Sequence, residues 1–122
     1  MSYTVHIKRA RDGVRSDSAH ISLEEWLVYV RSDGEMRLIG EAVIKTPKGE
    51  TIRYNAPGLT EWTDRQTGRK ALFDHHRVGG KVSVGNPSRE TLVKMFTVAR
   101  VLGGVVQGDD GEYYDAWGNP AK

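Results

Sequence analysis

The chain has 122 residues, of which 38% are hydrophobic and 28% are charged, and its formal net charge is +2. These values are typical of one globular domain, and three tryptophans and five tyrosines exclude a disordered chain. The absence of cysteine excludes disulfides, a thiol nucleophile and a cysteine-based metal site. No apolar run reaches the roughly 18 residues of a membrane span, and residues 1–8 lack the apolar core of a signal peptide. We therefore expect a cytoplasmic protein without a membrane partner.

The first predicted elements are a strand and a helix, separated by a polar loop over residues 10–20. Apolar and polar residues alternate over 3–8, which is the period of a half-buried strand. Ser22 and Glu25 then have the spacing of a capping box, which predicts a helix start. The apolar face of this helix consists of Leu23, Trp26, Leu27 and Val30. We expect the helix to end by residues 33–34, because glycine is a common C-terminal stop.

Between residues 36 and 86 the sequence predicts strands joined by tight turns. Pro47 and Gly49 favour a turn between two alternating runs, which indicates a hairpin. The alternating apolar residues of this hairpin are Leu38, Ala42, Ile44, Ile52, Tyr54 and Ala56. Further strands are predicted over 59–64 and 69–76 and around the valines of 82–84. Since the connections are short, we expect consecutive antiparallel neighbours in a meander.

A second helix begins near residue 86. Either Asn86 caps it with Pro87 at the first helical position, or Ser88 caps it. The inner face of this helix consists of Leu92, Met95, Phe96, Ala99 and Leu102. Two glycines at 103–104 end the helix, and 105–107 predict a short strand.

The order of these elements predicts the fold class. Strands are grouped in the middle of the chain and do not alternate with helices, which favours an α+β fold over a doubly wound α/β sheet. We expect a largely antiparallel sheet of about 5–7 strands with two α-helices packed on one face. Residues 1–122 would form a single domain, with 116–122 as a loose tail.

The densest cluster of ionisable side chains is Asp74-His75-His76, and Trp62 could lie near it in the sheet. Neighbouring side chains of a strand point to opposite faces, so His75 and His76 cannot share a metal ion. Asp74 and His76 together would supply only two ligands, which do not make a site. We therefore assign no catalytic residue and no metal ligand, and we expect no cofactor. A small metal-dependent or acid–base hydrolase that uses this cluster is the alternative.

The C-terminal segment is acidic and aromatic. Residues 105–122 carry a net charge of −3, because four acidic side chains are balanced only by Lys122. The spacing of the carboxylates does not match a calcium-binding loop of the EF-hand type. Because aromatic side chains are enriched at interface anchors, this segment is our predicted docking surface for a basic protein partner. The predicted partner-binding residues are Asp109, Asp110, Glu112, Tyr113, Tyr114 and Trp117.

Basic side chains suggest a second alternative, a nucleic-acid-binding domain. The residues concerned are Arg65, Arg69, Lys70 and Arg77, with Trp62 and Phe73 as possible stacking faces. Three acidic residues are interleaved with them, which is not the clean basic groove of a single-strand binder. We therefore do not expect a nucleic-acid partner. The glycine pairs match no phosphate-binding loop, and no serine lies in a nucleophile-elbow sequence.

Several segments resemble a group of small, uncharacterised bacterial α+β proteins. The resemblance rests on residues 21–26 (ISLEEW), 58–62 (GLTEW), 73–74 (FD), 86–87 (NP) and 102–112 (LGGVVQGDDGE), and it covers most of the chain. In size and style such proteins are similar to the immunity proteins of polymorphic toxin systems. That resemblance implies a cognate bacterial toxin as the partner and no catalysis.

The expected function is therefore a non-catalytic protein-binding domain, and by resemblance an immunity protein. The partner would be another protein or a second copy of the chain in a homo-oligomer. This interpretation requires the ionisable side chains to be dispersed over the exterior, with none gathered around a hollow.

Overall fold

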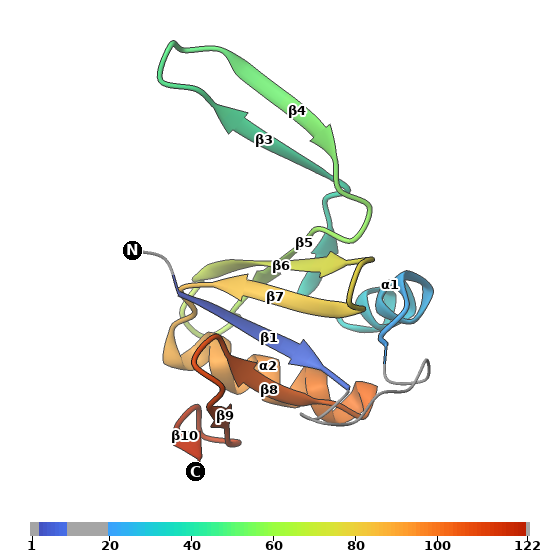
Figure 1. Cartoon of the computed structure of the whole chain (residues 1–122), viewed down its shortest axis with the longest axis vertical. Helices are drawn as coiled ribbons and strands as arrows, with labels where there is room; N and C mark the ends of the chain where they lie inside the picture. The colour runs from blue at the N-terminus through green and yellow to red at the C-terminus, as the bar shows by residue number, and fades with distance from the viewer. Residues whose placement is uncertain (1–2, 10–19, 122) are drawn as a thin grey trace.

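The computed structural model describes residues 3–9 and 20–121, and its largest element is an eight-stranded sheet (Figure 1). In their order across the sheet, the strands are β10 (Pro120–Ala121), β9 (Tyr113–Tyr114), β8 (Val105–Gly108), β1 (Thr4–Lys8), β7 (Lys81–Gly85), β6 (Lys70–His76), β5 (Thr60–Thr63) and β2 (Met36–Leu38). All neighbouring strands are antiparallel. The N-terminal strand β1 lies between β7 and β8, so it joins the middle of the chain to its C-terminal part.

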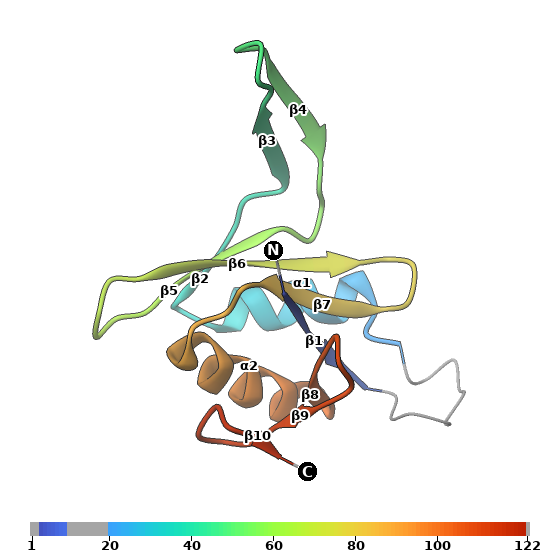
Figure 2. The same ribbon diagram turned by 60° about the vertical axis from the view of Figure 1, so that its left-hand side comes forward.

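Both helices cover the same face of this sheet, beneath the strands in Figure 2. Helix α1 (Leu23–Ser32) contacts β2 and β6, and helix α2 (Arg89–Leu102) contacts β1 and β8. The predicted capping box of α1 is present, since Ser22 and Glu25 each accept the backbone N–H of the other. Helix α2 is capped by Ser88, the second of the two predicted starts, and it ends at Gly103 with a φ of 74°.

The core lies between the helices and the sheet. Side chains alternate along each strand, and every second one is turned toward the helices. The core residues with 0% exposure are Val5, Ile7, Ile21, Trp26, Phe73, Val82, Met95 and Val98. Trp26 stacks on Phe73 with 6.3 Å between ring centroids, and its Nε1–H donates to the carbonyl oxygen of Gly58 at 2.8 Å. These side chains belong to one contiguous cluster, which fixes α1 and α2 on the sheet.

Strands β3 (Glu41–Lys45) and β4 (Thr51–Asn55) form a separate two-stranded sheet, here called the arm. The arm projects from the body on the side opposite to the helices (Figures 1 and 2). It continues the paired strands β2 and β5, and this ribbon bends where Gly40 has a φ of 78°. Glycine adopts this φ readily because it has no Cβ. On the other strand Ala56–Leu59 form an extra turn, in which the Leu59 N–H donates to the Ala56 oxygen at 3.0 Å.

The α+β class with a mostly antiparallel sheet is confirmed, but two details differ from the prediction. There are eight strands in the main sheet and two in the arm, because the arm forms a sheet of its own and short C-terminal strands extend the main one. Residues 116–121 are not a loose tail, since Pro120 and Ala121 pair with Tyr114 and Tyr113. The predicted loop lies outside the described residues, except for its last residue, His20.

Candidate interaction site

A row of polar side chains crosses the open face, which is the face of the main sheet that the helices leave uncovered. The register places Gln107 of β8 opposite His6 of β1, and Ser83 of β7 opposite both His6 and Asp74 of β6. Directly opposed residues of antiparallel strands point to the same face. Four neighbouring strands therefore each contribute one polar side chain to this row.

His6 is at the centre of a hydrogen-bonded trio on the open face. Its Nδ1 lies 2.6 Å from Ser83 Oγ, and its Nε2 lies 2.8 Å from Asp109 Oδ1. The hydrogen bond with His6 is the main reason that the pKa of Asp109 lies below its usual range. The arrangement of Asp109, His6 and Ser83 resembles the catalytic triad of a serine hydrolase. However, Ser83 is only 7% exposed. The ladders with β1 and β6 occupy the backbone N–H groups of β7, so this strand cannot supply an oxyanion hole beside Ser83.

The structure divides the predicted cluster of Trp62, Asp74, His75 and His76 between the two faces of the sheet. Trp62 and His75 are 4% and 7% exposed and lie on the helix side, where His75 Nε2 is 2.6 Å from the Ile21 oxygen. Asp74 and His76 lie on the open face. Within the described parts of the chain, no three histidine or acidic side chains are placed to hold a metal ion. The cluster therefore does not form one chemical site.

A hollow lies between the open face and the base of the arm. It consists of two adjoining depressions of about 750 and about 620 Å³. The residues that line both depressions are Tyr54, Asp74, His76 and Ser83. Further ionisable residues line the larger one, namely His6, His75, Arg77, Lys81 and Asp109. The expectation that ionisable side chains are dispersed and border no hollow is therefore wrong in part.

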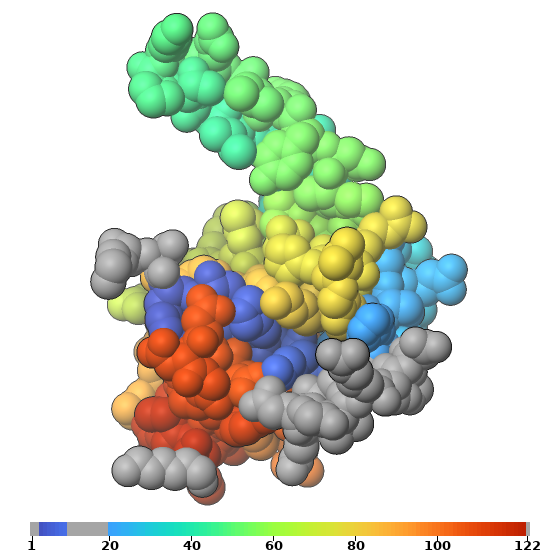
Figure 3. Space-filling view, viewed as in Figure 1, coloured from blue at the N-terminus to red at the C-terminus, as the bar shows by residue number. Residues whose placement is uncertain are grey.

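One face of the arm is apolar, and most of it lines the hollow. Ala42 is paired with Tyr54, and Ile44 is paired with Ile52, so these four side chains share one face, here called the arm face. Ile44, Ile52 and Tyr54 are 50%, 48% and 50% exposed. Ala42, Ile44 and Tyr54 line the hollow. In the space-filling view the arm stands clear of the body along most of its length (Figure 3).

Asp74 is a carboxylate of the hollow without a side-chain hydrogen bond or ion pair to any described residue. It is partly buried beneath the arm. By contrast, Glu61 at the other end of the hollow lies 3.2 Å from Arg37 and 3.6 Å from Lys70. Asp74 is therefore free to pair with a cation that enters from outside.

The predicted docking surface at the C-terminus is partly used inside the chain. Glu112 accepts hydrogen bonds from the hydroxyl groups of Tyr3 and Tyr114. Burial acts to raise the pKa of Glu112, but these bonds outweigh it, so the pKa lies below its usual range. Burial and the bond to Glu112 raise the pKa of Tyr114 to about 12. This part of the segment holds β1 to the C-terminal strands.

The other predicted residues of that surface differ in exposure. Asp109 belongs to the trio with His6, and Tyr113 is partly buried in β9. Asp110 is exposed, and Trp117 is 71% exposed. These two side chains are the part of the predicted surface that a partner could reach most easily.

Two basic residues of the nucleic-acid alternative lie close to acidic groups. Arg65 lies 3.9 Å and Lys70 lies 3.6 Å from a glutamate carboxylate. The exposed basic residues that complete the set are Arg69 and Arg77. Trp62 and Phe73 are buried in the core and cannot stack on bases.

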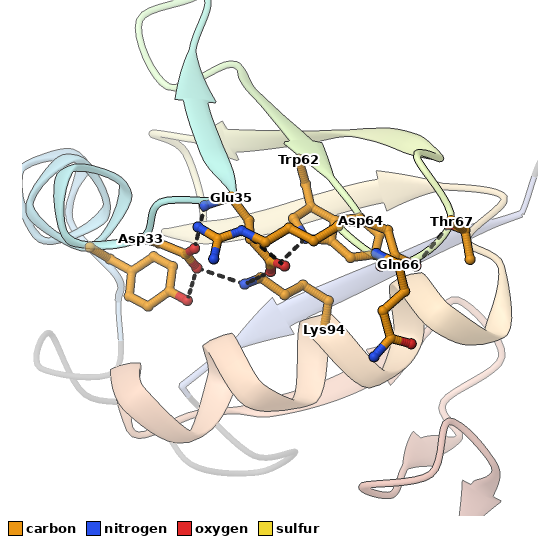
Figure 4. Close-up of polar contacts among 9 residues, drawn as sticks. Asp33, Glu35, Trp62, Asp64, Gln66, Thr67 and Lys94 are labelled. Atoms are coloured by element: carbon orange, nitrogen blue, oxygen red, sulfur yellow. Dashed lines mark hydrogen bonds and ion pairs between the residues drawn. The ribbon is translucent and has the colours of Figure 1, made fainter.

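A polar cluster that the sequence did not predict lies on the helix side, and Figure 4 shows its arrangement. Lys94 Nζ lies 2.8 Å from Asp33 Oδ2 and 2.7 Å from Glu35 Oε1. The hydroxyl group of Tyr29 donates to Asp33 at 2.5 Å, and the indole N–H of Trp62 donates to Glu35 at 3.2 Å. The side chains of Lys94 and Asp33 are 13% and 11% exposed. We call this group the ion cluster.

The pKa shifts of the ion cluster follow from these contacts. Burial acts to raise the pKa of Asp33, but the bonds from Lys94 and Tyr29 outweigh it and lower this pKa. The bond from Lys94 lowers the pKa of Glu35. Burial and the bond to Asp33 raise the pKa of Tyr29. Both carboxylates are thus ionised and paired, so the cluster braces α1 and β2 against α2 and offers no free group to a ligand.

Comparisons with known proteins add no relative. No protein-family model, curated protein or solved structure matches the chain. Among the described residues, no helix combines the length and the apolar character that crossing a membrane requires.

Proposed function

We propose that this chain is a non-catalytic protein-binding domain whose interface is the arm face together with the hollow. The observation that carries the proposal is the apolar face of Ile44, Ile52 and Tyr54, which the described parts of the body leave about half exposed. Exposed apolar patches rimmed by polar residues mark interaction sites.

The stability of the arm supports a partner. A hairpin of two strands is at best marginally stable alone in water, and it needs a further layer against its apolar face. The turn of the arm is well made, because Thr46 and Glu50 pair through their backbones at 2.9 Å and Gly49 has a φ of 84°. The sequence thus specifies the hairpin, but the described residues supply no layer that covers its apolar face. A partner that fills the hollow would supply the missing layer.

The polar groups of the hollow support binding over catalysis. His6 and Ser83 bond to each other, and Asp109 holds the other nitrogen of His6. Acyl transfer at Ser83 would need preorganised donors for the developing oxyanion, and the strand that carries Ser83 has its N–H groups in the ladders. Asp74 has no ion pair with a described residue, which suits recognition of a basic side chain.

An immunity protein is the specific form of this proposal, because the sequence resembles proteins similar to that class. In this form the partner is a cognate bacterial toxin. Co-expression of the chain with the product of a neighbouring toxin gene should restore growth, and the two proteins should co-purify. Continued growth arrest, without co-purification, would contradict the immunity form but leave the binding proposal to its own test.

The binding proposal is tested by site-specific photo-crosslinking in cells that make the chain. A benzoylphenylalanine placed at Tyr54 should give a discrete protein adduct. The matched control position is Val101 of α2, which is 67% exposed on the helix side and should give none. Ile52→Lys should abolish the Tyr54 adduct. Absence of an adduct at Tyr54, or equal adducts at both positions, would count against the proposal.

A further inference from the structure

Each chain carries both an exposed arm and a hollow at the base of the arm. We propose, resting on the proposed function, that the partner is a second copy of this chain and that the two copies exchange arms across a two-fold axis. The arm of each copy enters the hollow of the other. A two-fold arrangement lets each arm face meet its identical counterpart, which is the commonest symmetry of homo-oligomers.

The required contact area favours exchange over simple contact of two arms. Stable interfaces bury roughly 800 Å² on each partner. The arm face offers four side chains, of which the three large ones are only half exposed, so face-to-face contact of two arms buries much less than this. An arm inserted into the hollow is covered on both of its faces and also covers the open face. Exchange therefore engages both faces of the arm and the hollow.

The length of the arm agrees with this arrangement. Each of its strands has five residues, which corresponds to roughly 17 Å at about 3.3 Å per residue. Strands of a sheet lie roughly 4.8 Å apart, so an inserted arm spans three to four strands of the partner sheet. The row of Gln107, His6, Ser83 and Asp74 occupies four neighbouring strands.

Charge complementarity follows from the order of the layers. If the inserted arm turns its arm face toward the first arm, its other face turns toward the open face of the partner. That other face carries the two cations Lys45 and Arg53 and one carboxylate, Glu41. Among the described residues Arg53 is bonded only to Glu41, at 3.5 Å, and both side chains are largely exposed, so breaking this pair costs little. Asp74 on the partner sheet, which forms no ion pair with the described residues of its own chain, is the acceptor for Arg53.

The net charge does not oppose self-association. Residues 41–55 carry Lys45, Lys48 and Arg53 against Glu41 and Glu50, a net charge of +1, and the whole chain carries +2. Repulsion between two copies is therefore small.

Sedimentation velocity of the full chain, from about 1 to about 100 μM, tests the proposal. The wild type should sediment with twice the mass of one chain in the upper part of this range. Ile44→Lys and Ile52→Lys should each yield monomers, whereas Val101→Lys, at an exposed position on α2, should leave the dimer unchanged. Circular dichroism should show that all variants keep the folded body.

A charge reversal identifies the contact itself, and it does not depend on whether the lysine variants keep the arm folded. Asp74→Arg and Arg53→Asp should each weaken the dimer at least about tenfold, and the double variant should recover most of the loss. A wild type that stays monomeric up to about 100 μM overturns the exchange. So does a dimer that survives Ile44→Lys, or a loss that the double variant does not restore. A Tyr54 adduct with a different protein, combined with a monomeric chain, would overturn the exchange while supporting the proposed function.

Discussion

The helix side and the open side of the sheet differ in how far their apolar side chains are buried and their charged side chains are paired. On the helix side Trp26 and Phe73 are fully buried, and Lys94 pairs with both carboxylates of the ion cluster. On the open side the arm face is half exposed, and Asp74 has no ion pair to a described residue. The charged groups of the ion cluster are therefore paired within the chain, whereas the arm face and Asp74 on the open side lack such contacts with described residues.

This contrast indicates where the chain meets other molecules. Buried polar groups without partners are costly, and apolar patches left in water favour association. On the helix side the charged groups of the ion cluster satisfy each other, although His75 Nδ1 is buried there without a hydrogen-bond partner among the described residues. The open side gains both apolar burial and an ion pair only when something enters the hollow.

The largest expected difference between the two sides is in the stability lost when a large apolar side chain is truncated to alanine. Phe73→Ala removes a ring that packs on Trp26 and Trp62, and it should lower the free energy of unfolding by about 3–5 kcal/mol. Ile52→Ala on the arm face should change it by about 0.5 kcal/mol or less in dilute protein, because that side chain contacts little of the body. Urea unfolding at low protein concentration measures both. Equal losses would mean that the arm face is part of the folded core.

The next effect concerns the ion cluster. Lys94→Met should lower the free energy of unfolding by about 2–4 kcal/mol, because it leaves two partly buried carboxylates without their cation. The matched control is Lys48→Met in the exposed turn of the arm, which should change stability by less than about 0.5 kcal/mol. Equal losses in the free energy of unfolding for Lys94→Met and Lys48→Met would contradict the stabilising role of the ion cluster.

A smaller effect should appear in the pH dependence of stability. The pKa values of Asp33 and Glu35 in the folded chain lie below their ordinary values of 3.8 and 4.5, so the unfolded chain binds more protons in this range. The contribution of the ion cluster is thus present above pH 4.5 and is lost as the pH falls through the folded-state pKa values. Thermal unfolding from pH 7 to pH 3 should show the wild type and Lys94→Met approaching each other. A constant gap between them would contradict this assignment.

Local patterns in the sequence predicted the parts of the fold that depend on neighbouring residues. The capping box of Ser22 and Glu25 and the turn of Pro47 and Gly49 both lie where they were expected. The alternation along the arm also predicted which side chains share a face. It did not reveal that this face is uncovered, because alternation reports the direction of side chains and not what lies opposite them.

The candidate site could not be predicted because sheet order creates it. His6 and Asp109 are 103 residues apart in the chain, and Lys94 and Glu35 are 59 apart. They meet only because β1 enters between β7 and β8 and because the fold brings Lys94 of α2 to the segment that joins α1 to β2. No spacing in the sequence encodes those long-range pairings. The division of Asp74, His75 and His76 between the two faces of β6 was predictable, because it depends only on the alternation of neighbouring side chains along a strand.

Amide hydrogen exchange of β3 and β4, followed by mass spectrometry as the protein is diluted, tests the central claim most directly. At about 1 μM the amides of the arm should exchange with little protection, because the arm lacks a covering layer, while β1 and β7 exchange only through opening of the body. When a partner occupies the hollow, or when the chain is concentrated to about 100 μM, exchange in the arm should slow by a larger factor than exchange in β1, which slows only as far as binding stabilises the folded chain. An arm that is as protected as β1 in the dilute, isolated chain would contradict the account.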